Sequence, residues 1–325
     1  MPRVFLIDTD TASDDAVALI MALRAPDVRV AGITTVAGNV PVEQCTRNAL
    51  YTVELCGPRP YGKVPVYAGA AKPLIRTYQK ATWFHGRDGL GEHNYPAPRQ
   101  TAEMTHAVDA IISTIDANPG LVLVTLGPLT NVALALAKKP AIAANVSRCV
   151  IMGGNPCCEG NITPAAEFNI FVDPEAARMV LLSGLPIELV GWHLCRGDAV
   201  LNESDINRIL AFKTPLAEFA IECNSHARHA LKVQTGEDGI CLPDPVAMSI
   251  ALDPSISTDA SDHYVDVETQ SELTRGMTVV DRLNVADDER NRAVWAQPIA
   301  TKKKVRVYWT IDNAWWKQSL DAALR

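Results

Sequence analysis

Short apolar runs alternate with stretches of helical periodicity along most of the chain. The runs are "VFLI", "VRVAGITTV", "VPVYAG", "LVLVTLG", "RCVIMGG" and "IELVGWH", and helices are expected from Asp14, Val42, Ala102, Leu129, Asp173 and Glu203. Strands that alternate with helices form parallel sheets, and near-continuous apolar strands are typical of sheets buried on both faces. The sequence therefore predicts an α/β fold with an open, mostly parallel central sheet and helices on both faces.

The last third of the chain continues the pattern without a break. Helices are expected over 215–231 and 244–252, and "HYVDVET", "GMTVVD" and "VRVYWT" are typical of later strands. No internal repeat or low-complexity linker divides the 325 residues, and 48% of them are hydrophobic, enough for a large core. We therefore expect a single domain over residues 1–325.

The charge pattern excludes several classes of partner. The net charge is −7, and apart from Lys302, Lys303 and Lys304 the basic residues are dispersed, which argues against a nucleic-acid-binding surface. No apolar run reaches about 18 residues, and the N-terminus lacks the regions of a signal peptide. We expect a cytoplasmic protein with no membrane partner, whose eight scattered cysteines are reduced and mostly in the core.

Four aspartates lie at one junction between two apolar runs, in "VFLIDTDTASDDAVALIMAL". Ser13 is a good helix N-cap, and Asp14 and Asp15 in the first turn complement the positive end of the helix dipole. Capping does not require Asp8 or Asp10, which precede the helix at the end of a predicted strand. Carboxylates that converge on one point repel one another unless a cation lies between them. We therefore expect a hard divalent cation at this junction.

Other polar residues follow the later strands, where ligands bind in parallel sheets. Asn39 ends "TTVAGN", and either a Gly-Asn turn or a ligand contact explains it equally well. Glu167 and Asn169 lie in "AAEFN"; because Asp173 in "DPEAA" is the better helix cap, they are free to bind a ligand. Asp244 in "LPDPVAM", taken alone, favours a helix N-cap over a metal ligand.

Together these motifs resemble the nucleoside hydrolases, the inosine-uridine-preferring nucleoside N-ribohydrolase family. The resemblance runs from "DTDTASDDAVAL" through "TTVAGN", "TLGPLTNVALAL", "VIMGGN" and "AAEFNIFVDPEAA" to "LPDPVAM". It implies a Rossmann-like fold, a homodimer or homotetramer, and an enzyme of nucleoside salvage that hydrolyses ribonucleosides to free base and ribose. It also implies a Ca²⁺ held by Asp10, Asp15, the main-chain carbonyl of Leu126 and Asp244. The ribose contacts that it implies are Asp14, Asn39, Met152, Asn161, Glu167 and Asn169.

The chemistry of the reaction agrees with this acidic site. Cleavage of an N-glycosidic bond passes through an oxocarbenium-like ribosyl cation, which an anionic surround stabilises. A Ca²⁺ ion can orient a water and lower its pKa, and Asp10 can take the proton. We expect Asp8 to support these groups from behind rather than to bind the ion.

The chain departs from the resemblance where many members carry a histidine that protonates the leaving base. Pro243 precedes Asp244 at that place, so another acid is needed. The candidates are His85, His226 and His229, and we favour His229 because its helix is expected to overhang the site. Zinc is not expected, because His226 and His229 are three residues apart and lack a third ligand.

The contacts to the base are expected from two segments. These are "TYQKATWFHGRDGLG" and "FAIECNSHARHALK", with Trp83 and His226 as the candidate residues. Trp192 and His193, at a later strand end, favour packing over function. The sequence does not decide whether the substrate carries a purine or a pyrimidine base.

Two other functions compete with this interpretation. A haloacid-dehalogenase-like phosphohydrolase would use Asp8 as the nucleophile, Asp10 as the acid/base and Thr125 in its second motif. That function leaves the Asp14-Asp15 pair without a role. A non-catalytic Ca²⁺-dependent nucleoside- or ribose-binding protein would keep the same pocket without turnover.

Overall fold

Eight strands form one sheet in the computed structural model, which describes residues 2–58 and 60–325. The strands are β1 (Arg3–Thr9), β2 (Val28–Thr35), β3 (Val66–Ala68), β4 (Leu121–Thr125), β5 (Val146–Met152), β6 (Ile187–Val190), β7 (Ser257–His263) and β10 (Val305–Ile311). Their order is β3-β2-β1-β4-β5-β6-β10-β7, and every neighbouring pair is parallel except β10 and β7. The predicted α/β fold with a mostly parallel sheet is confirmed.

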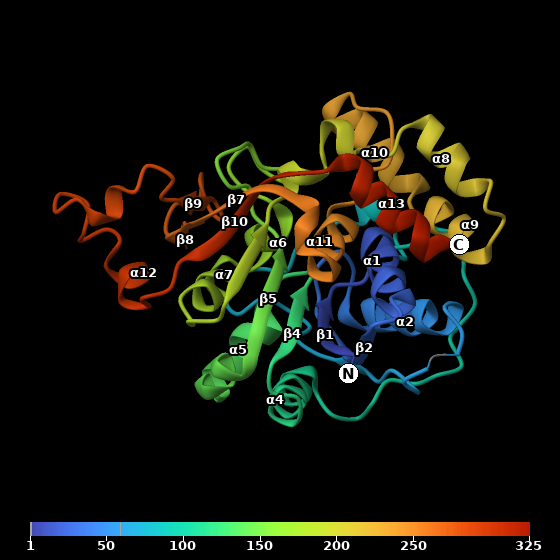
Figure 1. Cartoon of the computed structure of the whole chain (residues 1–325), viewed down its shortest axis with the longest axis horizontal. Coiled ribbons are helices and arrows are strands. Elements are labelled where there is room, and N and C mark those ends of the chain that lie inside the picture. The colour runs from blue at the N-terminus through green and yellow to red at the C-terminus, as the bar shows by residue number, and fades with distance from the viewer. Residues whose placement is uncertain (1, 59) are drawn as a thin grey trace.

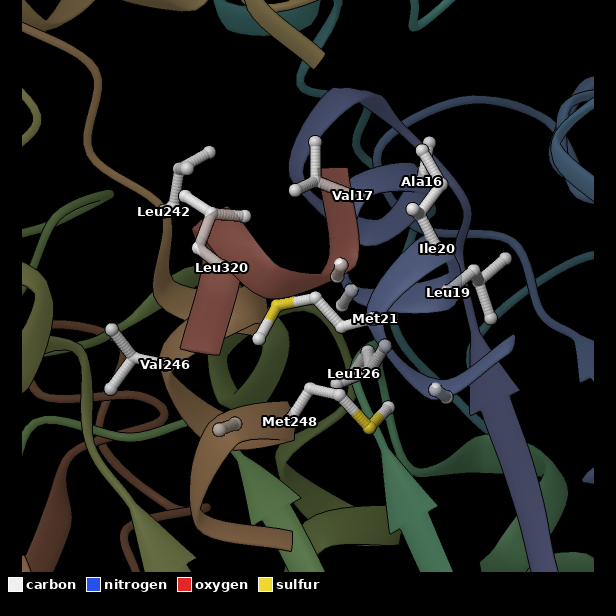
Figure 2. Packing of buried hydrophobic residues seen from close by; sticks show 14 of the residues in the cluster. Ala16, Val17, Leu19, Ile20, Met21, Leu126, Leu242, Val246, Met248 and Leu320 are labelled. Atoms are coloured by element: carbon white, nitrogen blue, oxygen red, sulfur yellow. The ribbon is translucent and has the colours of Figure 1, made fainter. Parts of the chain in front are cut away.

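Helices cover both faces of the sheet (Figure 1). One face carries α1 (Ser13–Arg24), α2 (Val42–Leu55), α9 (Pro215–Glu222), α11 (Pro243–Leu252) and α13 (Asn313–Leu324), and the other carries α4 (Ala107–Ala117), α5 (Thr130–Lys138) and α7 (Pro174–Leu181). Figure 2 shows side chains of α1, α11 and α13 gathered between these helices, among them Met21, Met248 and Leu320. All three are at most 1% exposed, so α1 and α11 are held firmly against each other.

The remaining elements lie outside these two layers. They are α3 (Thr82–His85), α6 (Phe168–Val172), α8 (Glu203–Leu210), α10 (Ser225–Thr235), α12 (Ala296–Ala300), β8 (Val265–Val267) and β9 (Thr278–Val280), with the 3₁₀ helices η1 (Pro140–Asn145), η2 (Trp192–Cys195), η3 (Gly197–Ala199), η4 (Pro254–Ile256) and η5 (Val285–Asp287). β8 and β9 pair as a separate two-stranded sheet. With α12 they project from the body of the molecule (Figure 1).

The strand order reverses between β1 and β4. From β1 the chain proceeds to β2 and β3 on one side, and from β4 it proceeds to β5 and β6 on the other. In the ladder Asp8 lies opposite Thr34 of β2 and Thr125 of β4, and the Leu126 amide donates a hydrogen bond to the Asp8 carbonyl (2.8 Å). Ligands in open α/β sheets bind at such a switch point, beyond the carboxyl ends of the strands.

Two of the predicted helices differ from the structure. The helix expected from Ala102 begins at Ala107, because the His106 side chain accepts a hydrogen bond from the Val108 amide and caps it. The helix expected over 215–231 is two helices, α9 and α10. They separate at Asn224, whose side-chain amide donates to the carbonyls of Ala220 and of Ser13 in α1. Hydrophobic periodicity does not reveal such long-range contacts.

Several elements were not expected from the sequence. β7 is polar because it is an edge strand, and α3 and α6 are each too short to show a helical period. Among the described residues, no helix is long and apolar enough to cross a membrane. Five of the eight cysteines are buried, in line with the expectation that most of them lie in the core.

Candidate active site

The carboxylate of Asp10 lies in a close-fitting pocket at the end of β1. Its Oδ2 accepts a hydrogen bond from the Asn39 amide (2.7 Å), and its Oδ1 is buried without a protein partner. A Cβ at Gly38 or at Gly127 would overlap this carboxylate, so glycine is required at both positions. Burial, and next the charge of Asp15, raise the pKa of Asp10 well above its ordinary value. The carboxylate is therefore held in place with one oxygen free to bind a ligand.

A cluster of three further aspartates lies beside the Asp10 carboxylate: Asp14, Asp15 and Asp244. One carboxylate oxygen from each lies within 4.8 Å of the other two, and all three residues are buried. Asp15 accepts from Thr9 Oγ1 (2.5 Å) and from the Ala12 amide (2.9 Å), whereas Asp14 Oδ1 has no hydrogen-bond partner. The metal ligands implied by the resemblance include Asp10 but not Asp14. The structure brings Asp14 into the trio, and Asp10 is near enough for its charge to raise the pKa of Asp244.

The electrostatics of this cluster fit a hard divalent cation. Burial raises the pKa of Asp14 and of Asp15 to about 6, and burial, followed by the charges of its neighbours, raises that of Asp244 well above its ordinary range. Buried carboxylates that repel one another and keep unpaired oxygens are the ligand set that Mg²⁺ or Ca²⁺ binds. The cluster therefore could hold a metal ion.

The N-cap residues that the sequence predicts for α1 and α11, Ser13 and Asp244, are both wrong. Ala12, not Ser13, is the N-cap of α1, and Asp15 reaches back to its amide, while the Ser13 hydroxyl hydrogen-bonds His85 instead. Leu242 is the N-cap of α11, so Asp244 lies inside the first turn rather than at the cap. The carboxylate of Asp244 is thus available to the cluster, which the sequence pattern by itself did not favour.

A cavity opens above the acidic cluster. Ten residues of the predicted site line it: Asp14, Asn39, Trp83, His85, Leu126, Met152, Asn161, Glu167, Asn169 and Asp244. Asp10 and Asp15 are fully buried and do not reach its surface. Residues that the sequence did not single out for the site also line it: Ala81, Phe84, Ile162, Phe168, Trp192, Leu231, Gln234, Cys241 and Pro243.

Amide and carboxylate groups form one wall of the cavity. The Asn169 side-chain amide donates to the Leu126 carbonyl (2.8 Å) and to the Met152 sulfur (3.2 Å). Glu167 accepts from the amides of Gly154 (2.8 Å) and Asn169 (2.9 Å) and caps α6. Asp173 caps α7 as expected, but Glu167 is itself a cap, of a helix that the sequence did not indicate. This wall is polar and held by backbone hydrogen bonds, which suits recognition of hydroxyl groups.

Of the three candidate histidines, only His85 lines the cavity. Its Nδ1 lies 2.9 Å from Ser13 Oγ and 3.7 Å from Asp14 Oδ1, and burial lowers its pKa to about 4. His226 is half-buried and is close enough for its charge to contribute to that lowering, and His229 is exposed on α10. The structure therefore does not bring His229 into the site.

The buried face of α10 explains this difference. Ala227 and Leu231 are buried on that face, and Leu231 and Gln234 reach the cavity from it. His229 follows a different helical stripe, whereas half-buried His226 lies at the edge of the buried face. The apolar spacing of Ala227 and Leu231 was the signal that could have identified Gln234, because residues three and four apart share a helix face.

A model of the inosine-uridine preferring nucleoside hydrolase family matches residues 5–317. The chain belongs to this family. It is 40% identical over 296 residues to the pyrimidine-specific ribonucleoside hydrolase RihA of Shewanella sp. (strain MR-7), with 90% of this chain and 91% of that protein covered. Two solved nucleoside hydrolases share its fold: the plant enzyme PpNRh1 (30% identity, TM-score 0.91, 100% and 99% coverage) and a purine-preferring ribonucleoside hydrolase from Gardnerella vaginalis (29%, 0.87, 99% and 98%).

Membership of the nucleoside hydrolase family settles the class of reaction. The chain is a ribonucleoside hydrolase, which cleaves the N-glycosidic bond to give a free base and ribose. The phosphohydrolase alternative is wrong. The family match excludes that class of reaction, and Asp8, the nucleophile that it needed, instead accepts hydrogen bonds from Thr34 (2.5 Å) and Asn131 (2.9 Å).

Proposed function

We propose that this nucleoside hydrolase uses Ca²⁺ and prefers pyrimidine ribonucleosides. The observation that carries the proposal is the buried cluster of Asp14, Asp15 and Asp244 at the base of a cavity lined by the amide and carboxylate groups of Asn39, Asn161, Glu167 and Asn169. The preference for pyrimidines is supported by the 40% identical relative named as pyrimidine-specific, whereas the purine-preferring structural neighbour is 29% identical.

The ion would be held by Asp15 and Asp244, with Asp10, Asp14 and the Leu126 carbonyl around it. Bound there, Ca²⁺ would supply positive charge that orients a water and the ribose hydroxyls and makes that water more acidic. Asp10 would take the proton of the attacking water, because Asn39 and the two glycines fix its carboxylate. Asp8, bonded to Asn131, would support this arrangement from behind.

The polar wall would bind the ribose. Asp14, Asn39, Met152, Asn161, Glu167 and Asn169 line the cavity next to the cluster, and their groups can accept from or donate to sugar hydroxyls. Buried carboxylates on this wall also stabilise a ribosyl cation as positive charge develops. This role needs no covalent intermediate with the protein.

His85 would serve the leaving base. Ser13 engages Nδ1, which leaves Nε2 as the nitrogen available to substrate, and the lowered pKa keeps the free imidazole neutral at pH 7. A neutral imidazole can still donate its Nε2 hydrogen to a base that gains negative charge. Trp83, with half of its surface exposed, and Gln234 line the same cavity and are our candidates for base contacts.

An assay of reducing sugar released from four nucleosides tests this proposal. We expect kcat/KM for uridine and cytidine to exceed that for inosine and guanosine by at least ~10-fold, and a chelator to remove activity on all four. A preference for inosine would contradict the base assignment. Binding of nucleosides without any release of sugar would identify a binding protein instead.

We also propose that the chain assembles as a homodimer or homotetramer. Leu273, Leu283 and Val294 are 77–86% exposed on the segment around β8, β9 and α12, and exposed apolar groups of this size favour association. Light scattering coupled to size exclusion measures the mass directly. A monomer at micromolar concentration would contradict the proposal.

A further inference from the structure

A helical segment, which we call the arm, begins after η2, packs on the body of the molecule and ends just before α11. It consists of residues 196–240 and contains η3, α8, α9 and α10 (Figure 1). At its base the outgoing and returning segments pair, because Leu201 and Ile240 exchange two backbone hydrogen bonds of 3.0 Å. We call this pairing the neck of the arm. Cys195 and Cys241 flank the arm at the neck.

The thiols of these two cysteines lie against each other. The Cys241 sulfur is 2.9 Å from the Cys195 sulfur and 3.3 Å from the Cys195 carbonyl oxygen, to which it donates. Cys195 in turn donates to the Trp192 carbonyl (2.8 Å). Both cysteines are free. Because a disulfide bond is about 2.05 Å long, less than about 1 Å of sulfur movement separates this pair from a covalent link.

The two thiols differ in their access to solvent. Cys241 lines the cavity, whereas Cys195 is 1% exposed and lies behind it. Burial also raises the pKa of the Cys195 thiol well above its ordinary value. A small reagent that enters the cavity therefore meets Cys241 first, and Cys195 is placed to react with the product.

We propose that Cys195 and Cys241 are an oxidation-sensitive pair, which a peroxide entering the cavity joins as a disulfide across the neck of the arm. The Cys241 thiolate attacks one peroxide oxygen, the O–O bond breaks, and water leaves after protonation, so Cys241 becomes a sulfenic acid. The Cys195 sulfur then attacks that sulfur as its thiol gives up its proton, the S–O bond breaks and a second water leaves. The two thiols are oxidised by two electrons, and the peroxide is reduced to two waters.

This link would act on the cavity through the arm. Leu231 and Gln234 reach the cavity from α10, which lies within the arm. A disulfide at the neck would join the two ends of the arm next to η2 and α11, and would thus restrain the segment that carries α10. The inference does not depend on the base preference or on the metal.

Mass spectrometry of the full chain tests the link directly. Reduced protein is treated with a small excess of hydrogen peroxide, blocked with an alkylating agent and mapped without reduction. We expect a loss of about 2 Da and a cross-linked peptide pair that contains Cys195 and Cys241, both reversed by dithiothreitol. A map in which these two cysteines stay unlinked, while Cys157 or Cys158 is oxidised, would overturn the proposal.

Two variants and a matched control test the order of reaction. In Cys195→Ala we expect peroxide to leave Cys241 as a sulfenic or sulfinic acid, and in Cys241→Ala we expect Cys195 to stay a thiol. Cys158→Ser, which leaves both cysteines of the pair in place, should still form the link. Equal oxidation of the remaining cysteine in both alanine variants would contradict entry through the cavity.

Thermal unfolding provides a second readout that needs no activity. Oxidised wild-type protein and oxidised Cys158→Ser should melt roughly 5 °C above their reduced forms, since the link closes a long loop in the unfolded chain. Cys195→Ala and Cys241→Ala should show no such rise. If one of these variants fails to fold, the peptide map of the wild-type protein still decides the question.

Discussion

The floor and the rim of the cavity are built in different ways. The floor consists of Asp14 and Asp244, which line the cavity, together with Asp10 and Asp15, which are buried behind its surface. All four are at most 7% exposed and lie near strand ends and helix starts of the central fold. The rim consists of Trp83, His85, Trp192, Leu231 and Gln234, which come from α3, η2 and α10.

The floor is tied to the sheet by backbone hydrogen bonds, whereas much of the rim is held by side-chain packing. The backbone N–H of Asn39 donates a hydrogen bond to Asp10, and that of Ala12 donates one to Asp15. On the rim, Trp83 is 50% exposed and Gln234 is exposed on α10. A fixed floor suits the chemistry common to all nucleosides, and an adaptable rim suits discrimination among bases. Substitutions in the floor should therefore reduce turnover for every substrate, and those in the rim should depend on the base.

The largest expected effect is that of Asp10→Asn. It should lower kcat by ~10²–10⁴-fold with little change in KM, because the base acts in the transition state. Asp8 lies two residues earlier in the chain, and its carboxylate accepts hydrogen bonds from Thr34 and Asn131. Asp8→Asn should lower kcat by about 10–100-fold. Steady-state kinetics with uridine measure both. A greater loss in Asp8→Asn would reverse the roles that we assign to the two aspartates.

Removal of the metal should lower kcat by at least ~100-fold, and added Ca²⁺ should restore it. We expect elemental analysis to find about one Ca²⁺ per chain, and to find less in Asp244→Asn because a buried ligand is lost. Asp259→Asn, on the exposed edge strand β7, is the matched control and should keep its metal. Zinc in place of calcium, or full activity of the metal-free protein, would contradict the proposed floor.

On the rim, His85→Ala should lower kcat for natural nucleosides by ~10²–10³-fold. The same variant should hardly affect p-nitrophenyl riboside, because the nitrophenolate leaves without a proton. His229→Ala is the control, since its side chain is exposed, and the structure predicts normal kinetics for it. If His229→Ala instead lowered kcat for natural nucleosides but not for p-nitrophenyl riboside, His229 would be the leaving-group acid, as the sequence predicts.

The smallest expected effect is that of Gln234→Ala. Loss of one exposed amide on the rim should raise KM by roughly 3–10-fold for one class of base and leave kcat unchanged, which is the pattern of a binding contact. Val233→Ala, its 75% exposed neighbour on α10, should change neither constant. An equal rise of KM for purines and pyrimidines would place Gln234 with the ribose contacts.

The sequence predicted the floor better than the rim. The aspartates of "DTDTASDD" are adjacent to a strand and a helix that hydrophobic periodicity identifies, so their meeting at the strand ends followed from the fold class. Asp15 and Asp244, both expected as ligands from the resemblance, lie in the buried cluster, and the structure adds Asp14 to it. The complete ligand set, with Asp10 and the Leu126 carbonyl, stays a prediction. The helix boundaries near Asn224 and His106 also escaped prediction, because side-chain contacts set them. The expectation of one domain over residues 1–325 stays a prediction.

The sequence by itself determined the fold class and the family, because both depend on local periodicity and on motifs of adjacent residues. Only the tertiary structure decided that Ser13 pairs with His85 rather than caps α1, and that α10 turns His229 outward and Gln234 toward the cavity. It alone brought the thiols of Cys195 and Cys241 together. These contacts join segments far apart in the chain, and they depend on which helix faces the core buries, a choice that packing makes over the whole molecule.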